Sequence, residues 1–156
     1  GLGTKIEILL PAVAGVPAAP QPRPSPGPGG CETVVIVEDD PRVREVTSRI
    51  LRQAGYRVLD AATGADALAL LGSEDVGLVI SDVVMPAMNG RQLADRLRER
   101  PLPPRMLFIS GHPQEIVYRR GLLDPGTPLL AKPFTPGALL ARVREVLDAP
   151  PPPAAR

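Results

Sequence analysis

Residues 77–90 read GLVISDVVMPAMNG, and this stretch decides the fold because a buried run in it ends on a carboxylate. Its residues 78–80 form an apolar run that is too short for a helix and rich in β-branched side chains. Such a run is typical of a strand buried on both faces of a parallel sheet. Asp82 follows almost at once, and residues 86–90 indicate a turn. Because ligands of open α/β sheets bind beyond the carboxyl ends of the strands, Asp82 lies where chemistry is expected.

Four further short apolar runs are candidate strands, at residues 34–37, 56–59, 106–109 and 129–130. Segments with apolar residues at helical spacing separate them, among them a helix that we expect from about residue 91 to 100. Five alternations of strand and helix with short connections predict an α/β fold with right-handed crossovers. We expect a flavodoxin-like, doubly wound, five-stranded parallel sheet of order 2-1-3-4-5 with helices on both faces.

Composition divides the 156 residues into four expected parts. Residues 1–11 alternate like a strand after a glycine-rich turn. Residues 12–32 form a Pro/Ala/Gly-rich linker that cannot bury enough apolar surface to offset its ordering entropy. Residues 33–148 form the folded domain, and residues 149–156 form a Pro-rich tail.

Charge, cysteine count and hydropathy restrict the class of protein. The formal net charge of +1 argues against a nucleic-acid binder. Cys31 is the single cysteine, so no intrachain disulfide can form, and a reducing, cytoplasmic compartment is expected. No apolar run approaches the roughly 20 residues of a membrane span, so we expect no membrane contact by this segment.

Polar side chains follow four of the five predicted strands: Glu38 and Asp39, Asp82, Ser110, and Lys132. In the predicted order the first and third strands are neighbours, so three carboxylates would crowd one site. Carboxylates that close cannot all stay ionised and unpaired, and a hard cation such as Mg²⁺ relieves the repulsion. With a hydroxyl and an ammonium added, the set suits a phosphoryl group that a carboxylate attacks.

These motifs stand in the order found in receiver domains of two-component response regulators, which residues 33–148 resemble. The matching motifs are Glu38-Asp39, Asp82 with Met85-Pro86 and Asn89-Gly90, Ser110-Gly111, and Lys132-Pro133-Phe134. The resemblance implies that Asp82 accepts a phosphoryl group from a phosphohistidine. It also implies that Glu38, Asp39, Asp82 and the backbone carbonyl of Val84 hold Mg²⁺, while Ser110 and Lys132 contact the phosphoryl oxygens.

Residues 1–11 and 121–126 resemble segments of a larger protein. The segment 1–11, GLGTKIEILLP, resembles the end of a histidine-kinase ATP-binding domain, and residues 121–126 resemble receivers fused behind such kinases. This resemblance implies the C-terminal receiver of a hybrid sensor histidine kinase, whose parent chain can be membrane-anchored. We expect no kinase catalytic core within the 156 residues. The implied partner is a histidine kinase or a histidine phosphotransfer domain, in cis or in trans.

One departure from the family and two alternatives remain open. Many receivers carry Tyr or Phe three residues before the lysine, where this chain has Leu129, so the domain could be a stand-alone phosphate sink. A haloacid-dehalogenase-like, Mg²⁺-dependent phosphatase also uses an Asp nucleophile, but it needs a second Asp where this chain has Val84. Asp40 is interpreted as a helix cap and is kept out of the site.

Overall fold

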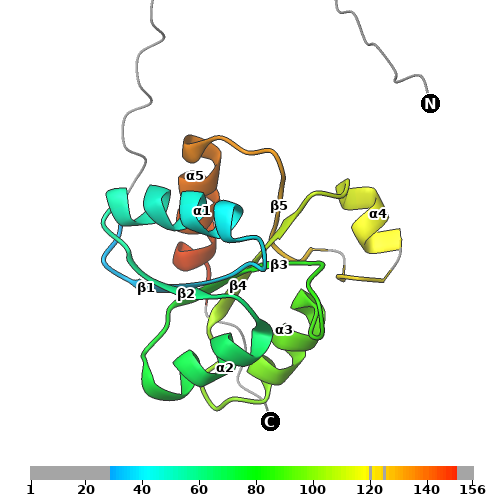
Figure 1. Ribbon diagram of the computed structural model, residues 1–156, viewed down its shortest axis with the longest axis horizontal. Helices are drawn as coiled ribbons and strands as arrows, with labels where there is room; N and C mark the ends of the chain where they lie inside the picture. The colour runs from blue at the N-terminus through cyan, green and yellow to red at the C-terminus, as the bar shows by residue number, and fades with distance from the viewer. Residues whose placement is uncertain (1–28, 120, 125, 151–156) are drawn as a thin grey trace, which may run out of the picture.

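The computed structural model describes residues 29–119, 121–124 and 126–150. The strand expected within residues 1–11 and most of the expected linker, residues 12–32, lie outside the described residues. The described strands are β1 (Thr33–Val37), β2 (Arg57–Ala61), β3 (Leu78–Asp82), β4 (Arg105–Ser110) and β5 (Leu129–Ala131). They form one parallel sheet of order β2-β1-β3-β4-β5 (Figure 1). The predicted strand order is therefore confirmed.

Helices connect successive strands. They are α1 (Pro41–Gln53), α2 (Gly64–Ser73), α3 (Gly90–Arg98), α4 (Gln114–Arg119) and α5 (Pro136–Asp148). Of these, α1, α2, α3 and α5 each begin after a capping side chain. The Asp40 side chain accepts hydrogen bonds from two amides of the first turn of α1, which confirms its role as a cap. The Thr63 side chain caps α2 by accepting a hydrogen bond from the Asp66 amide. Among the described residues, no helix has the length and apolar character that crossing a bilayer requires.

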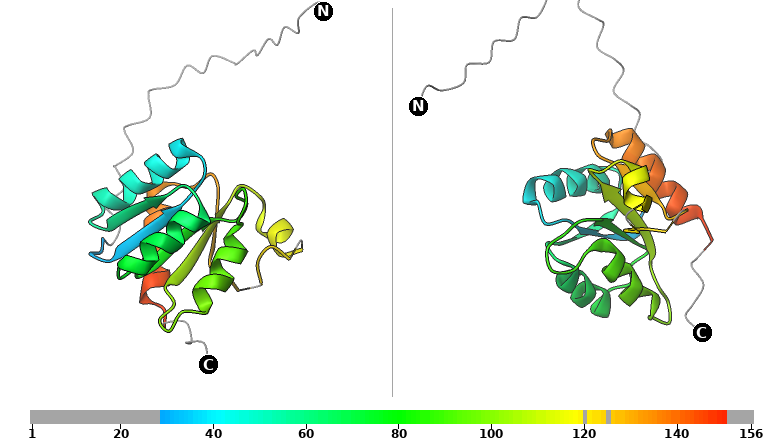
Figure 2. Two further views of the ribbon diagram at one scale, coloured as in Figure 1. Left: turned by 60° about the horizontal axis from the view of Figure 1, so that its bottom comes forward. Right: turned by 90° about the vertical axis from the view of Figure 1, so that its right-hand side faces the viewer.

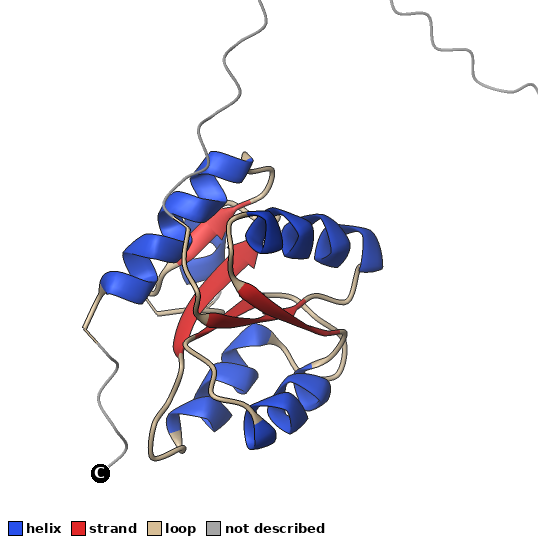
Figure 3. Ribbon diagram, turned by 90° about the vertical axis from the view of Figure 1, so that its left-hand side faces the viewer, coloured by secondary structure: helices blue, strands red, loops and turns tan. Residues whose placement is uncertain are grey.

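The helices cover both faces of the sheet, as expected. α1 and α5 lie on one face and α2 and α3 on the other (Figures 2 and 3). Alternate residues of β1 point to opposite faces of the sheet. Val34 and Ile36 pack with α1 and α5, whereas Val35 and Val37 pack with α2 and α3. All four side chains are buried, which is why β1 reads as a continuous apolar run.

Element boundaries differ from the sequence prediction by one or two residues. The second strand runs from Arg57 to Ala61 instead of 56–59, and Tyr56 is a buried core side chain ahead of it. The third helix starts at Gly90, since the side chains of Asn89 and Gln92 form a reciprocal capping box that begins the helix there. It ends at Arg98, ahead of the prolines that break the chain before β4.

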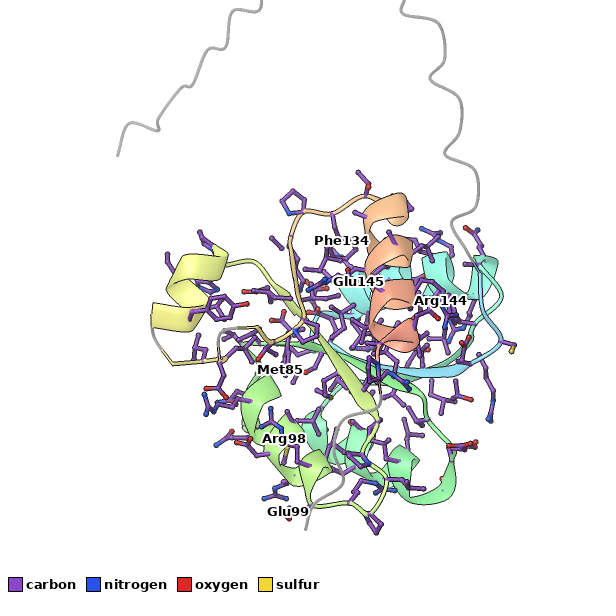
Figure 4. All side chains as sticks on the ribbon, turned by 180° about the vertical axis from the view of Figure 1, so that it is seen from behind. Met85, Arg98, Glu99, Phe134, Arg144 and Glu145 are labelled. Carbon is purple, nitrogen blue, oxygen red and sulfur yellow. The ribbon has the colours of Figure 1, made fainter. Side chains whose placement is uncertain are left out.

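The described end of the expected linker packs against the domain. Glu32 forms an ion pair of 2.9 Å with Arg144 of α5, and Figure 4 shows Arg144 on this helix. The hydrogen bond to Arg144 lowers the pKa of Glu32. A side chain at Gly30 would overlap Glu32 and the Tyr56 ring, so this close approach requires glycine. The direction in which the chain enters β1 is therefore set by contacts with the domain.

Candidate functional site: an acidic cluster beside a lysine

The three predicted acidic side chains lie together at the carboxyl edge of the sheet. Glu38 and Asp39 follow β1, and Asp82 ends β3, the strand that pairs with β1. One carboxylate oxygen from each of the three lies within 4.8 Å of the others. Glu38 is 5 % exposed whereas Asp39 is exposed, so the cluster extends from the interior to the surface. The expected crowding of three carboxylates is present.

Lys132 contacts two of these carboxylates. Its Nζ donates to Asp82 Oδ2 and to Glu38 Oε2, both at 2.7 Å. The ammonium thus lies between Asp82 and Glu38, a shared position that the sequence analysis did not predict. The backbone N–H of Lys132 donates to the Ser110 carbonyl at 2.7 Å, which fastens the end of β5 to the end of β4. The Lys132–Pro133 peptide bond is cis.

Asp82 is held through both of its oxygens. Oδ2 accepts from Lys132, and Oδ1 accepts from the backbone N–H of Val84 at 3.0 Å. Val84, whose backbone carbonyl was predicted to bind the metal, contacts Asp82 through its backbone N–H. Val84 lies in the loop that directly follows β3. Ser110 is buried at the end of β4, and its hydroxyl accepts from the His112 N–H at 3.0 Å. The hydroxyl therefore belongs to a local turn, and its described partner lies outside the acidic cluster.

Burial and charge act in opposite directions on the pKa values of buried Glu38 and half-buried Lys132. Burial is the largest influence on Glu38 and raises its pKa, although its bond to Lys132 opposes the change; repulsion from Asp82 adds to the rise. Burial alone would lower the pKa of Lys132, but the bonds to Asp82 and Glu38 outweigh it, and the net pKa is raised. The site therefore keeps Lys132 protonated while it disfavours the charged form of Glu38.

The donor set fits a hard divalent cation. The cluster offers carboxylate oxygens, the ligand type that Mg²⁺ prefers, and part of it is open to the solvent that supplies water ligands. With all three carboxylates ionised, Lys132 balances only one of the negative charges. A cation bound by Glu38 and Asp39 would favour the charged form of Glu38, which burial opposes.

Two further contacts at the site were not predicted from the sequence. Gly90 was assigned to a turn and to the receiver motif, but not to close packing; a Cβ there would lie 2.5 Å from the Asp82 carbonyl oxygen and 3.0 Å from the Phe108 ring. Phe108 is buried on β4 beside β3, so Gly90 allows α3 to approach both strands. Arg44 of α1 donates to the backbone of the acidic pair. It is one of 16 arginines, and no local motif distinguishes it.

The fold and the site together define a doubly wound α/β domain with three clustered carboxylates and a lysine at the carboxyl edge of its sheet. Residues 34–144 match the family described as the response regulator receiver domain. The chain belongs to this family, as the sequence motifs predicted. The family match argues against the haloacid-dehalogenase alternative, which needs a second Asp where this chain has Val84.

Relatives of known name agree with this assignment. The sensor kinase CckA of Brucella abortus (strain 2308) is 38 % identical over 122 residues, which are 76 % of this chain and 13 % of CckA. The aerobic respiration control protein ArcA of Escherichia coli (strain K12) is 34 % identical over 115 residues, covering 74 % of this chain and 48 % of ArcA. The chain thus spans only part of the curated relatives that it matches.

Solved structures give the same result for the fold. The chemotaxis response regulator CheY4 of Vibrio cholerae superposes with a TM-score of 0.66 at 31 % identity, covering 75 % of this chain and 99 % of CheY4. The receiver domain of the hybrid histidine kinase CckA superposes with a TM-score of 0.61 at 34 % identity, covering 74 % and 99 %. Both similarities are consistent with the family match, which begins after the expected linker.

Replacing Gly90 with alanine tests the close packing behind Asp82. We expect Gly90→Ala to lower the free energy of unfolding by about 1–3 kcal/mol, because the added methyl would overlap backbone and a buried ring. Gly72→Ala in α2 is the matched control, since nothing lies within 4 Å of its Cβ, and a gain of about 0.5–1 kcal/mol is expected. Urea unfolding measures both. Equal changes in the two variants would contradict the packing argument.

Proposed function

We propose that this chain is a phosphoacceptor receiver in a two-component phosphorelay and that Asp82 is the phosphorylated residue. The observation that carries the proposal is the setting of the Asp82 carboxylate. One oxygen is held by the Val84 amide and the other by Lys132, within 4.8 Å of oxygens from Glu38 and Asp39. A carboxylate oxygen of Asp82 attacks the phosphorus of a phosphohistidine, and the bond from phosphorus to the imidazole nitrogen breaks.

Mg²⁺ is the proposed cofactor. Glu38, Asp39, Asp82 and the backbone carbonyl of Val84 would hold it, and it would supply positive charge for the phosphoryl oxygens. Lys132 already contacts Asp82 Oδ2, so its ammonium lies beside the oxygen that would carry the phosphoryl group. The Ser110 hydroxyl would turn from the His112 amide to contact a phosphoryl oxygen.

We also propose that the chain comes from a hybrid sensor histidine kinase. Support comes from the similarity to CckA, which the relatives include both as a sensor kinase and as the receiver of a hybrid histidine kinase. The donor would be a histidine kinase or a histidine phosphotransfer domain, in cis or in trans. The kinase-like segment 1–11 lies outside the described residues and remains a prediction. We also propose a cytoplasmic setting, because the single cysteine, Cys31, cannot form an intrachain disulfide and suits a reducing compartment.

A relay or phosphate-sink role, rather than a conformational switch, is favoured by the packing of Leu129. Leu129 pairs in register with Phe108 and packs against the apolar cluster that also holds Val117 and Leu123. Receivers that switch by ring rotation turn an exposed aromatic inward at this position. Leu129 already contacts the core and has no ring that could turn inward. Phosphorylation therefore shifts the equilibrium toward a second conformation less than it does in receivers with an aromatic residue here.

Intact-mass measurement after incubation with acetyl phosphate and Mg²⁺ tests the acceptor. We expect a single phosphoryl adduct on the wild-type chain and none on Asp82→Asn, because the amide oxygen is a far weaker nucleophile than the carboxylate. Asp95→Asn is the matched control: Asp95 is an exposed residue of α3 and should leave the adduct unchanged. An adduct that persists in Asp82→Asn would disprove the assignment.

Amide exchange with and without beryllofluoride, a phosphoryl mimic, tests the relay role. Protection should rise around Asp82, Ser110 and Lys132 but hardly across residues 139–147 of α5, since Leu129 gives the bound state few new contacts on that face. Leu129→Tyr provides the comparison, because it restores an aromatic ring at this position. Broad protection of α5 in the wild-type chain, or dimerisation on adding the mimic, would contradict the relay role.

A further inference from the structure

Arg44 holds the main chain of the acidic pair. It lies on the second turn of α1, partly buried, and its Nη1 donates to the Glu38 carbonyl oxygen at 2.5 Å and to the Asp39 carbonyl oxygen at 3.5 Å. The longer contact is weak, whereas the shorter one is a close charged contact, below the usual N–H···O range, that places the guanidinium directly on the Glu38 carbonyl oxygen. The guanidinium therefore binds the backbone that carries two of the three clustered carboxylates.

We propose that Arg44 is a positioning residue that sets Glu38 and Asp39 for binding the divalent cation. This inference rests on the proposed function, because it assigns a role toward the Mg²⁺ site. Two other contacts constrain the same loop: the Glu38 N–H donates to the Ala61 carbonyl at 3.2 Å, and the Asp40 side chain caps α1. Arg44 is the side chain that holds the peptide groups between these two contacts.

Arg44 contacts carbonyl oxygens rather than carboxylates, so its role differs from neutralising the charge of the acidic side chains. An arginine paired with the carboxylates would occupy the oxygens that a cation needs. In these contacts Arg44 binds the backbone instead and occupies no carboxylate oxygen of Glu38 or Asp39. The charges that chiefly govern Glu38 are those of Lys132 and Asp82, so the contribution of Arg44 is geometric.

Rigid placement matters because Mg²⁺ demands near-ideal octahedral geometry. Residues that orient the ligands of a metal without touching it typically change affinity by about 10–100-fold when they are replaced. Backbone support is less direct than a bond to the ligand group, so the low end of that range is expected here. The fold itself depends less on Arg44, since β1 and α1 are packed through buried apolar side chains such as Val34 and Leu51.

The test is a Mg²⁺ titration of the full chain followed by thermal unfolding, in which the shift of the melting temperature reports the half-saturating concentration. We compare wild type, Arg44→Met, Arg44→Lys and Arg49→Met. Methionine keeps the length and apolar stem but removes every donor. Arg49 is the matched control because it is an exposed arginine of the same helix.

Arg44→Met should raise the half-saturating Mg²⁺ concentration about tenfold. Arg44→Lys should give a smaller rise, because one ammonium keeps a donor near the carbonyls, and Arg49→Met should match the wild type. Equal Mg²⁺ affinity in Arg44→Met and Arg49→Met would overturn the inference, even where Arg44→Met melts lower without metal, since that pattern marks a purely structural role.

Should Arg44→Met not fold, Arg44→Lys decides the question: wild-type Mg²⁺ affinity in that variant overturns the inference, and a measurable loss supports it. Absence of any Mg²⁺-dependent shift in the wild-type chain would overturn the proposed metal site and this inference with it. That result is distinguishable from failure of Arg44 alone, in which the wild type responds to Mg²⁺ and the variants respond equally.

Discussion

The mutual repulsion of Glu38, Asp39 and Asp82 is the constraint on which the rest of the site depends. Their carboxylate oxygens approach within 4.8 Å, and burial raises the pKa of Glu38 further. Lys132 relieves part of the repulsion by contacting two of the three. Such an arrangement is costly without a function, because like charges at this distance destabilise the folded chain. It is the expected arrangement where a metal and a phosphoryl group bind together.

The fold brings these side chains together through its strand order. Since β1 pairs with β3 and β3 with β4, the carboxyl ends of three consecutive neighbours meet at one edge of the sheet, and β5 adds Lys132. Helices on both faces bury the strands, so the loops at this edge begin from rigid positions. Gly90 then lets α3 approach the end of β3, and Arg44 holds the loop after β1.

Much of this was predictable because strand ends and caps are local signals. Glu38, Asp39 and Asp82 each follow a buried apolar run, and Asp40 and Thr63 precede amphipathic segments, so their positions follow from the pattern and the strand order. The contact of Lys132 with both Asp82 and Glu38 could not be derived from the sequence, because it depends on the conformation that a flexible side chain adopts in the assembled site.

Contacts made through backbone atoms could not be predicted from the sequence either. The hydrogen bonds of Arg44 join a helix side chain to carbonyl oxygens, which every residue has, so no residue type signals the partner. The approach of Gly90 to Phe108 depends on the distance between α3 and the sheet, which tertiary packing decides. Both are consequences of the assembled fold rather than of a local pattern.

A crystal structure of the chain with Mg²⁺ and beryllofluoride tests the central claim most directly, namely that the Lys132 ammonium and a divalent cation share the acidic cluster. We expect the cation on Glu38, Asp39 and Asp82, and the ammonium turned from Glu38 to a fluorine atom on Asp82. A complex in which Lys132 keeps its bond to Glu38 and the cation lies away from Asp39 would contradict the account.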